Sequence, residues 1–216
     1  IVNNLSVTAL AGNITDSGVI SVGGNTVFSV AAANSIVLDE ASTFTGTVTV
    51  PASFANLTLN DSTALSLNAF TLSGDLDLTA ASLMQGGAWT VNGVSSLAGT
   101  AGNITLGNVG NDFVGAVSAS GSANVTLVDA NDLLLGDVTV VGALTATALN
   151  GSITQTGAPD NIEVGGATTV TASGDVTLDN AANDFMSVAG VADNMTLRDV
   201  DDLDLAGVNI FTGFGS

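Results

Sequence analysis

The 216-residue chain contains no cysteine, histidine, lysine or tyrosine, and its only basic residue is Arg198. Without cysteine, neither a disulfide nor thiolate chemistry is available. With one basic side chain the protein can neutralise few phosphates, so we expect no nucleic acid partner. No run of about 18 apolar residues is present, so we expect no membrane insertion either. Aromatic residues make up only 4%, which leaves few platforms for stacking sugars, and Trp89 is expected to fill the core.

Strong helix formers are also scarce, because Lys is absent and Arg and Glu are rare, whereas there are 26 glycines and many Thr, Val and Asn residues. This composition favours strands and turns over helices. Short runs at residues 47–50, 76–79 and 175–178 alternate apolar with polar side chains, which places one row inside and one outside. Gly-Gly, Asn-Gly and Gly-Asn pairs separate the runs. Their residues tolerate positive φ, so we expect tight turns built on that conformation.

One unit of about 70 residues occurs three times along the chain. Residues 57–65, 125–133 and 195–203 align with offsets of 68 and 70, and Phe113 and Phe185 close identical Asn-Asp-Phe triplets. Repetition at a fixed period is typical of solenoids, propellers and arrays. A propeller blade needs about 40 to 50 residues with aromatic signatures, and these are missing.

The spacing of the turns favours a solenoid. Glycine-marked turns such as those at Gly93, Gly115 and Gly142 recur after roughly 20 to 28 residues, which suits coils of two or three short strands. We therefore predict an all-β fold, a parallel β-helix (β-solenoid) of about nine rungs, in which Val, Leu and Ile stack inside and Thr and Asn form ladders at the surface or turns. Residues 1–216 are expected to be one segment, with units at approximately 5–74, 75–142 and 143–213.

Neither end of the sequence looks like a cap. Residues 1–7 and 208–213 continue the strand pattern, and an uncapped solenoid leaves strand edges unpaired. We therefore expect the chain to be a segment of a longer one, or segments to pair end to end.

Four segments, residues 102–106, residues 101–113 with their Asn-Asp-Phe ending, residues 164–178, and the Asp-Asp-Leu-Asp-Leu run at 201–205, share one style of sequence. They resemble the repeat regions of filamentous-haemagglutinin-like bacterial adhesins, which are two-partner secretion exoproteins or autotransporter passengers. The resemblance implies a right-handed parallel β-helix in the stalk of an extracellular fibre, at the cell surface or attached to the outer membrane. The Asn-Pro motifs of that family's secretion domain are missing, so neither an export signal nor a binding tip is expected here.

Some parallel β-helices are enzymes, so the acidic residues need to be weighed as catalysts. A lyase would need a basic residue, whereas a glycosidase would need only two carboxylates, and the candidate pairs are Asp129 with Asp132 and Asp199 with Asp202. Asp61, Asp129 and Asp199 occupy equivalent positions in the three units, however. A residue copied into every unit is better explained as a turn former that accepts a bond from its own backbone. We therefore expect no catalytic residue.

The net charge of −19 raises the question of metal binding. Carboxylates are hard ligands suited to Ca²⁺, and Asp199, Asp201, Asp202 and Asp204 place four of them within six residues. Strand alternation would put Asp199 and Asp201 on one face and the other two on the opposite face, so the four cannot all bind one ion unless a turn intervenes. The Gly-Gly-x-Gly-x-Asp calcium repeat is absent. A solvated acidic face is the preferred interpretation, and a calcium site is the alternative.

These observations predict a non-enzymatic structural segment of a secreted or cell-surface adhesin, serving as a rigid spacer or a fibre-forming unit. Its expected partners are adjacent solenoid segments, like copies placed end to end, or the surface of a host or neighbouring cell. Two alternatives stay open. One is an end-to-end polymerising matrix or filament protein, and the other is a β-helical carbohydrate-active protein with an acidic groove.

Overall fold

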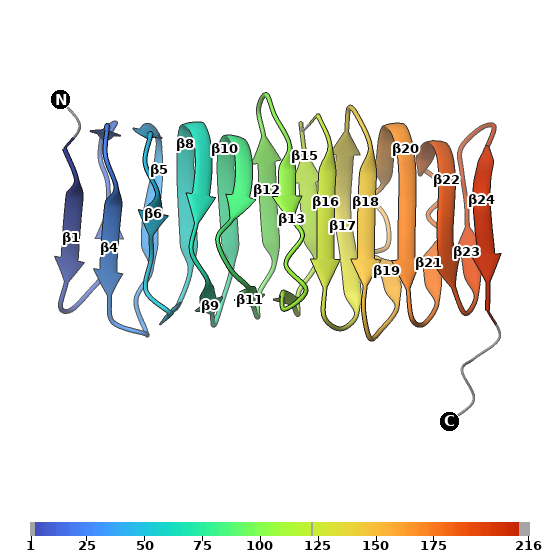
Figure 1. Cartoon of the computed structure of the whole chain (residues 1–216), viewed down its shortest axis with the longest axis horizontal. Helices are drawn as coiled ribbons and strands as arrows, with labels where there is room; N and C mark the ends of the chain where they lie inside the picture. The colour runs from blue at the N-terminus through green and yellow to red at the C-terminus, as the bar shows by residue number, and fades with distance from the viewer. Residues whose placement is uncertain (1–2, 122, 212–216) are drawn as a thin grey trace.

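The computed structural model describes residues 3–121 and 123–211, which form a rod of stacked strands with the two termini at opposite ends (Figure 1). Residues 1–2 and 212–213, which the sequence assigns to the terminal strands, lie outside the described residues. Within the described part there is no helix, and so none that could cross a membrane. The predicted all-β fold is confirmed.

Most of the strands are short, as the close spacing of the turns predicts. In chain order they are β1 (Leu5–Ala9), β2 (Ile14–Thr15), β3 (Ser21–Val22), β4 (Thr26–Val30), β5 (Ile36–Phe44), β6 (Val48–Thr49), β7 (Ser53–Phe54), β8 (Leu57–Leu67), β9 (Phe70–Leu72), β10 (Leu76–Gln85), β11 (Trp89–Val91) and β12 (Ser95–Gly99). They continue with β13 (Ile104–Leu106), β14 (Asp112–Phe113), β15 (Val117–Ser120), β16 (Val125–Asp129), β17 (Leu133–Val140), β18 (Leu144–Ala148), β19 (Ile153–Gln155), β20 (Ile162–Ala172), β21 (Val176–Leu178), β22 (Asp184–Ala192), β23 (Met195–Leu197) and β24 (Leu205–Ile210).

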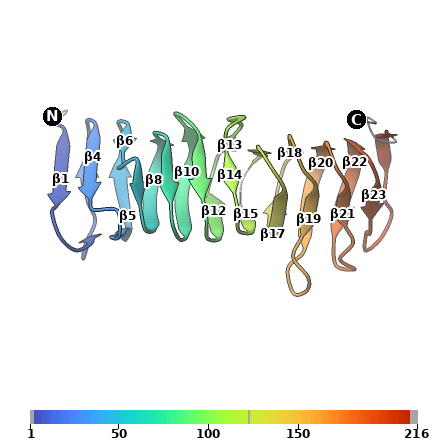
Figure 2. The same ribbon diagram turned by 90° about the horizontal axis from the view of Figure 1, so that it is seen from below.

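Strands that are neighbours in space pair in parallel, and each pairs with a strand about one coil further along the chain. Leu76 lies opposite Leu57, for example, and Leu144 lies opposite Val125. Each of these two coils takes 19 residues, fewer than the roughly 20 to 28 expected. The solenoid accordingly has about ten turns, whereas about nine were predicted. Figure 2 shows the same stacking from a second direction.

One ladder of backbone pairs runs the whole length of the rod. At the ordinary spacing of about 4.8 Å between paired strands, its ten steps span about 48 Å. The strands of this ladder are, in order, β1, β4, β6, β8, β10, β13, β16, β18, β20, β22 and β24.

The core is a column of inward-facing aliphatic side chains with a few aromatic ones. Alternation is strict in strands such as β4, where Thr26, Phe28 and Val30 point inward between exposed residues. Trp89 is fully buried and stacks on Phe70 with ring centroids 4.9 Å apart. Its indole N–H donates a hydrogen bond to a backbone carbonyl at 3.0 Å, so the predicted core role is confirmed.

The expectation that the turn glycines adopt positive φ is wrong for most of them. In the described part of the chain only Gly12, Gly121 and Gly207 have positive φ. The glycines at several corners are needed for a different reason, which is the close approach of stacked rungs. A Cβ on Gly115 would overlap the backbone of Gly93 one rung below.

Asparagine and aspartate side chains form ladders at the corners, as predicted for asparagine. Asn124 accepts the N–H of Ala143 at 2.9 Å through its side-chain oxygen. Asn56 accepts the N–H of Asp75 at 2.7 Å, and Asp75 in turn accepts the next rung's N–H at 3.0 Å. These bonds satisfy backbone groups where the strand ladders are interrupted.

Candidate functional site

The three copied aspartates, Asp61, Asp129 and Asp199, all bind the backbone of the preceding rung. In each case a carboxylate oxygen accepts the N–H of a phenylalanine one rung below. The donors are Phe44 at 3.2 Å, Phe113 at 2.8 Å and Phe185 at 2.8 Å. The repeated aspartate therefore ties one rung to the next in all three units, an arrangement that the sequence spacing alone does not show.

Asp61 and Asp129 also form the predicted local turn, in which the carboxylate accepts the N–H two residues further on, at 2.9 and 2.8 Å. Asp129 is fully buried, and both of its oxygens accept backbone bonds. Burial raises the pKa of its carboxyl above 3.8, although these two bonds act to lower it. Asp132 is exposed and accepts the N–H of Ser152 at 2.7 Å. Asp129 thus has no free oxygen to offer a substrate.

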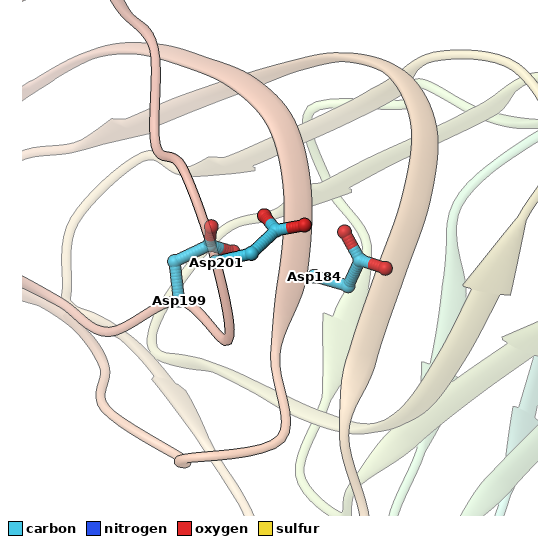
Figure 3. A group of neighbouring side chains, drawn as sticks. All are labelled: Asp184, Asp199 and Asp201. Carbon is cyan, nitrogen blue, oxygen red and sulfur yellow. The ribbon is translucent and has the colours of Figure 1, made fainter.

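The third copy differs from the others because acidic side chains gather there. Carboxylate oxygens of Asp184, Asp199 and Asp201 lie within 4.8 Å of one another and face a common space (Figure 3). Asp184 begins β22, whereas Asp199 and Asp201 lie between β23 and β24. The sequence correctly placed Asp199 with Asp201 but missed Asp184. The sequence feature that could have pointed to Asp184 is the Asn-Asp-Phe triplet, because the N–H of its phenylalanine, Phe185, donates a hydrogen bond to Asp199.

A groove of about 370 Å³ adjoins these acids and is lined by Glu163, Asp184, Asp201 and Asp202 among others. Asp201 and Asp202 both line this groove, although a regular strand would place them on opposite faces. The chain bends at residues 200–201, so the alternation of an extended strand does not apply there. Asp204 lies outside the group of converging carboxylates.

The spacing of the three carboxylates is compatible with one shared cation. Oxygens bound to the same Ca²⁺ at about 2.3 to 2.6 Å lie at most about 5 Å apart. One oxygen of Asp199 is buried and has no hydrogen-bond partner. Ca²⁺ prefers six to eight oxygens, so water would have to supply several. Calcium binding stays a prediction, and calorimetry that shows neither binding heat nor a higher melting temperature would exclude it.

A second repeated corner, which the sequence reading missed, consists of a glutamine paired with a buried asparagine. Asn111 and Gln85 exchange two side-chain hydrogen bonds, at 2.8 and 3.1 Å, across 26 residues. Asn183 and Gln155 exchange two at 3.0 and 2.7 Å across 28 residues. Both asparagines are fully buried, and the signal available in the sequence was again the Asn-Asp-Phe triplet.

The first unit carries a reduced form of this corner. Ser42 takes the place of the asparagine and accepts the N–H of Ile20 at 3.0 Å, just as Asn111 accepts the N–H of Trp89 at 2.9 Å. Asp16 stands where the other units have glutamine, and both of its carboxylate oxygens are buried without a hydrogen-bond partner. The three units therefore share a scaffold and differ in side-chain chemistry at matching positions.

Parallel pairing, a continuous core and corners repeated three times define a repeat protein of the β-solenoid class. The chain belongs to the family described as repeats of unknown function (DUF5649), which matches residues 1–51, 55–120 and 122–192. These three matches fit the three repeats. The chain matches no curated protein and no solved structure.

Proposed function

We propose that this chain is a rigid structural segment of a secreted or cell-surface bacterial adhesin, in which it acts as a spacer or fibre-forming unit. The observation that carries the proposal is the backbone ladder that continues from β1 to β24. A rod held by parallel ladders and an aliphatic core resists bending, because any bend must break pairs in several rungs. The extracellular part of the proposal rests on the resemblance of the repeats to adhesin stalks.

The charge distribution supports a solvent-exposed structural role at the cell surface. Acidic side chains occur on many rungs, and a net charge of −19 keeps such rods from aggregating side by side. The inward positions, by contrast, are almost all apolar, and the largest fully buried side chains include Trp89, Phe44 and Phe113. The sequence thus separates a repelling exterior from a cohesive interior.

Labelling of intact cells that produce the protein tests this function. An antibody raised against the chain should stain unpermeabilised cells or their shed material, and protease added outside should remove the signal. A cytoplasmic protein serves as the control and must stay protected. Signal that appears only after permeabilisation would contradict the proposal.

The acidic groove favours one alternative, a carbohydrate-active protein, because Asp184, Asp199 and Asp201 bring three acids together in the third unit. The second unit keeps acids at two of these positions, Asp112 and Asp129, and has Asn131 at the third. The first unit has Thr43 and Thr63 at the positions of Asp184 and Asp201. Release of reducing ends from a polysaccharide, lost in the variant Asp184→Asn, would support this alternative over the spacer.

A further inference from the structure

The dipeptide Asn-Gly occurs twice in the chain, at Asn92–Gly93 and at Asn150–Gly151. The first pair follows β11 and the second follows β18, so both lie at corners between strands. Glycine has no side chain to shield its backbone nitrogen, and that nitrogen can approach the side-chain carbonyl carbon of the preceding asparagine. Asn-Gly is therefore the pair at which the backbone most readily displaces the amide group of an asparagine.

Stacking requires the glycine of each pair. A Cβ on Gly93 would overlap the backbone of Gly74 one rung below. A Cβ on Gly151 would likewise overlap the backbone of Asp132. A side chain at either corner would displace the neighbouring rung, so the fold maintains a glycine after each of these asparagines.

Each asparagine supplies a hydrogen bond between rungs. The side-chain amide of Asn92 donates to the carbonyl of Leu72 at 2.8 Å, and that of Asn150 donates to the carbonyl of Ala130 at 2.9 Å. An ionised aspartate can only accept hydrogen bonds. Conversion of either asparagine to aspartate would therefore place two acceptors opposite each other and remove the bond.

The two glycine nitrogens differ in how they are held. The N–H of Gly93 donates to the carbonyl of Gly74 at 3.0 Å. The N–H of Gly151 has no hydrogen-bond partner among the residues that the structure describes. Asn92 and Asn150 are both exposed, so access of water does not distinguish the pairs. The nitrogen that would attack is bonded at the first pair and free at the second.

We propose that Asn150 is a site of spontaneous deamidation in the folded rod and that the fold protects Asn92. The backbone nitrogen of Gly151 bonds to Cγ of Asn150, the bond from Cγ to Nδ2 breaks, and ammonia leaves with the proton of the Gly151 nitrogen. Water then opens the cyclic imide at either of its two carbonyl carbons, which gives aspartate or isoaspartate. Water is the only other reactant in the two steps.

Deamidation would weaken the corner that begins the third unit. The aspartate product loses the bond to Ala130 and adds a negative charge to the more acidic half of the rod. Isoaspartate also lengthens the backbone between two bonded positions. These are Leu149, whose N–H donates to the carbonyl of Asp129 at 2.9 Å, and Ser152, whose N–H donates to the carboxylate of Asp132 at 2.7 Å. The inference goes beyond the proposed function, because the rod is a spacer with or without this modification.

Peptide mapping by mass spectrometry tests the assignment. The intact protein is kept for days in mildly alkaline buffer, and aspartate and isoaspartate are measured at both asparagines. In the folded rod, conversion at Asn150 should be at least tenfold faster than at Asn92. In urea the N–H of Gly93 is released from its bond, so the two sites should convert at comparable rates. Equal rates in the folded protein, no conversion at Asn150, or a tenfold difference that persists in urea would overturn the proposal.

Two variants at the same position test the structural consequence. Asn150→Gln keeps an amide but would have to close a larger, less favourable ring, so its melting temperature should fall less during the incubation than that of the wild type. Freshly prepared Asn150→Asp should already melt below the wild type, because its carboxylate faces the carbonyl of Ala130. An Asn150→Asp protein as stable as the wild type would contradict the predicted weakening. None of these results bears on cell-surface labelling, so the spacer function is judged separately.

Discussion

Asp129 shows how one residue in this fold balances opposing forces. Its carboxylate is removed from water, which disfavours the charge, while two backbone N–H groups point at its oxygens and favour it. Burial has the larger effect, and the nearby charges of Asp112 and Asp132 add to it, so the pKa is raised above 3.8. The residue thus fastens two rungs together at an electrostatic cost when it is ionised.

The pH dependence of stability should reveal that cost. Because the pKa of Asp129 is raised in the folded protein, its contribution to stability is fully present below about 3.8 and is lost as pH rises through the folded value. Asp129→Asn cannot titrate, so the free energy of unfolding lost in this variant should be largest at acid pH and shrink as pH rises. Urea unfolding of both proteins between about pH 3 and 7 measures the difference.

The variant Asp77→Asn provides the control, because Asp77 is an exposed acid whose strand neighbours Thr58 and Ser96 are uncharged. Its removal takes away one negative charge without touching a buried bond. A difference between wild type and Asp129→Asn that grows with pH would contradict the assignment.

For the repeated aspartates, the sequence predicted the local turn bond but not the hydrogen bond to a neighbouring rung. The turn bonds of Asp61 and Asp129 follow from local chemistry, because the acceptor and the donor are two residues apart. The bond from Phe185 to Asp199 spans 14 residues and depends on how one rung lies over another. The same reason explains why Asp184 was missed, since its closeness to Asp199 is a property of stacking.

The corner formed by Gln85 and Asn111 is the structural element most open to a mutational test. In Asn111→Ala the buried N–H of Trp89 loses its acceptor and the Leu106 carbonyl loses a donor. The Gln85 amide loses its two bonds to Asn111 but keeps those to the Gly87 carbonyl and the Asn108 N–H. A buried group left unsatisfied costs about 1 to 3 kcal/mol and each other lost hydrogen bond costs about 0.5 to 1.5 kcal/mol, so the variant should lose at least about 2 kcal/mol of unfolding free energy. Urea unfolding followed by circular dichroism measures the loss.

Asn111→Ser is the matched comparison, because the first unit already uses Ser42 at this position to accept the N–H of Ile20. A serine at 111 should keep the bond from Trp89 and lose the bonds to Gln85 and to the Leu106 carbonyl, so it should cost roughly half as much as alanine. Equal losses in the two variants would show that the backbone bond is not what the asparagine provides.

Strands and coil spacing could be predicted because they depend on local alternation and on turn residues that recur. The predicted number of turns was too low because several coils use only 19 residues. The glycine expectation failed for a related reason. Positive φ is a property of a single residue, whereas Gly115 is required by the backbone of Gly93 in the neighbouring rung, a contact that appears only once the coils are stacked.

On the scale of the whole molecule, charge is distributed unevenly along the rod. Six acidic residues occur up to residue 108 and fourteen after it, and the densest group is Asp184, Asp199 and Asp201 near the C-terminal end. Arg198 is the only basic side chain in the chain. The C-terminal part of the rod is therefore the most strongly negative, and self-repulsion opposes its stability.

Relieving that repulsion should stabilise the protein. Asp201→Asn removes one exposed charge from the group, and at low salt we expect the melting temperature to rise by about 1 to 3 °C, since surface charge contacts are worth about 0.2 to 1 kcal/mol. In about 1 M NaCl, where the screening length is about 3 Å, the gain should vanish. Asp77→Asn, which removes an exposed charge whose strand neighbours are uncharged, should shift the melting temperature less under both conditions. A melting temperature lowered by Asp201→Asn at low salt would mean that the carboxylate makes a favourable contact, and the repulsion argument would fail.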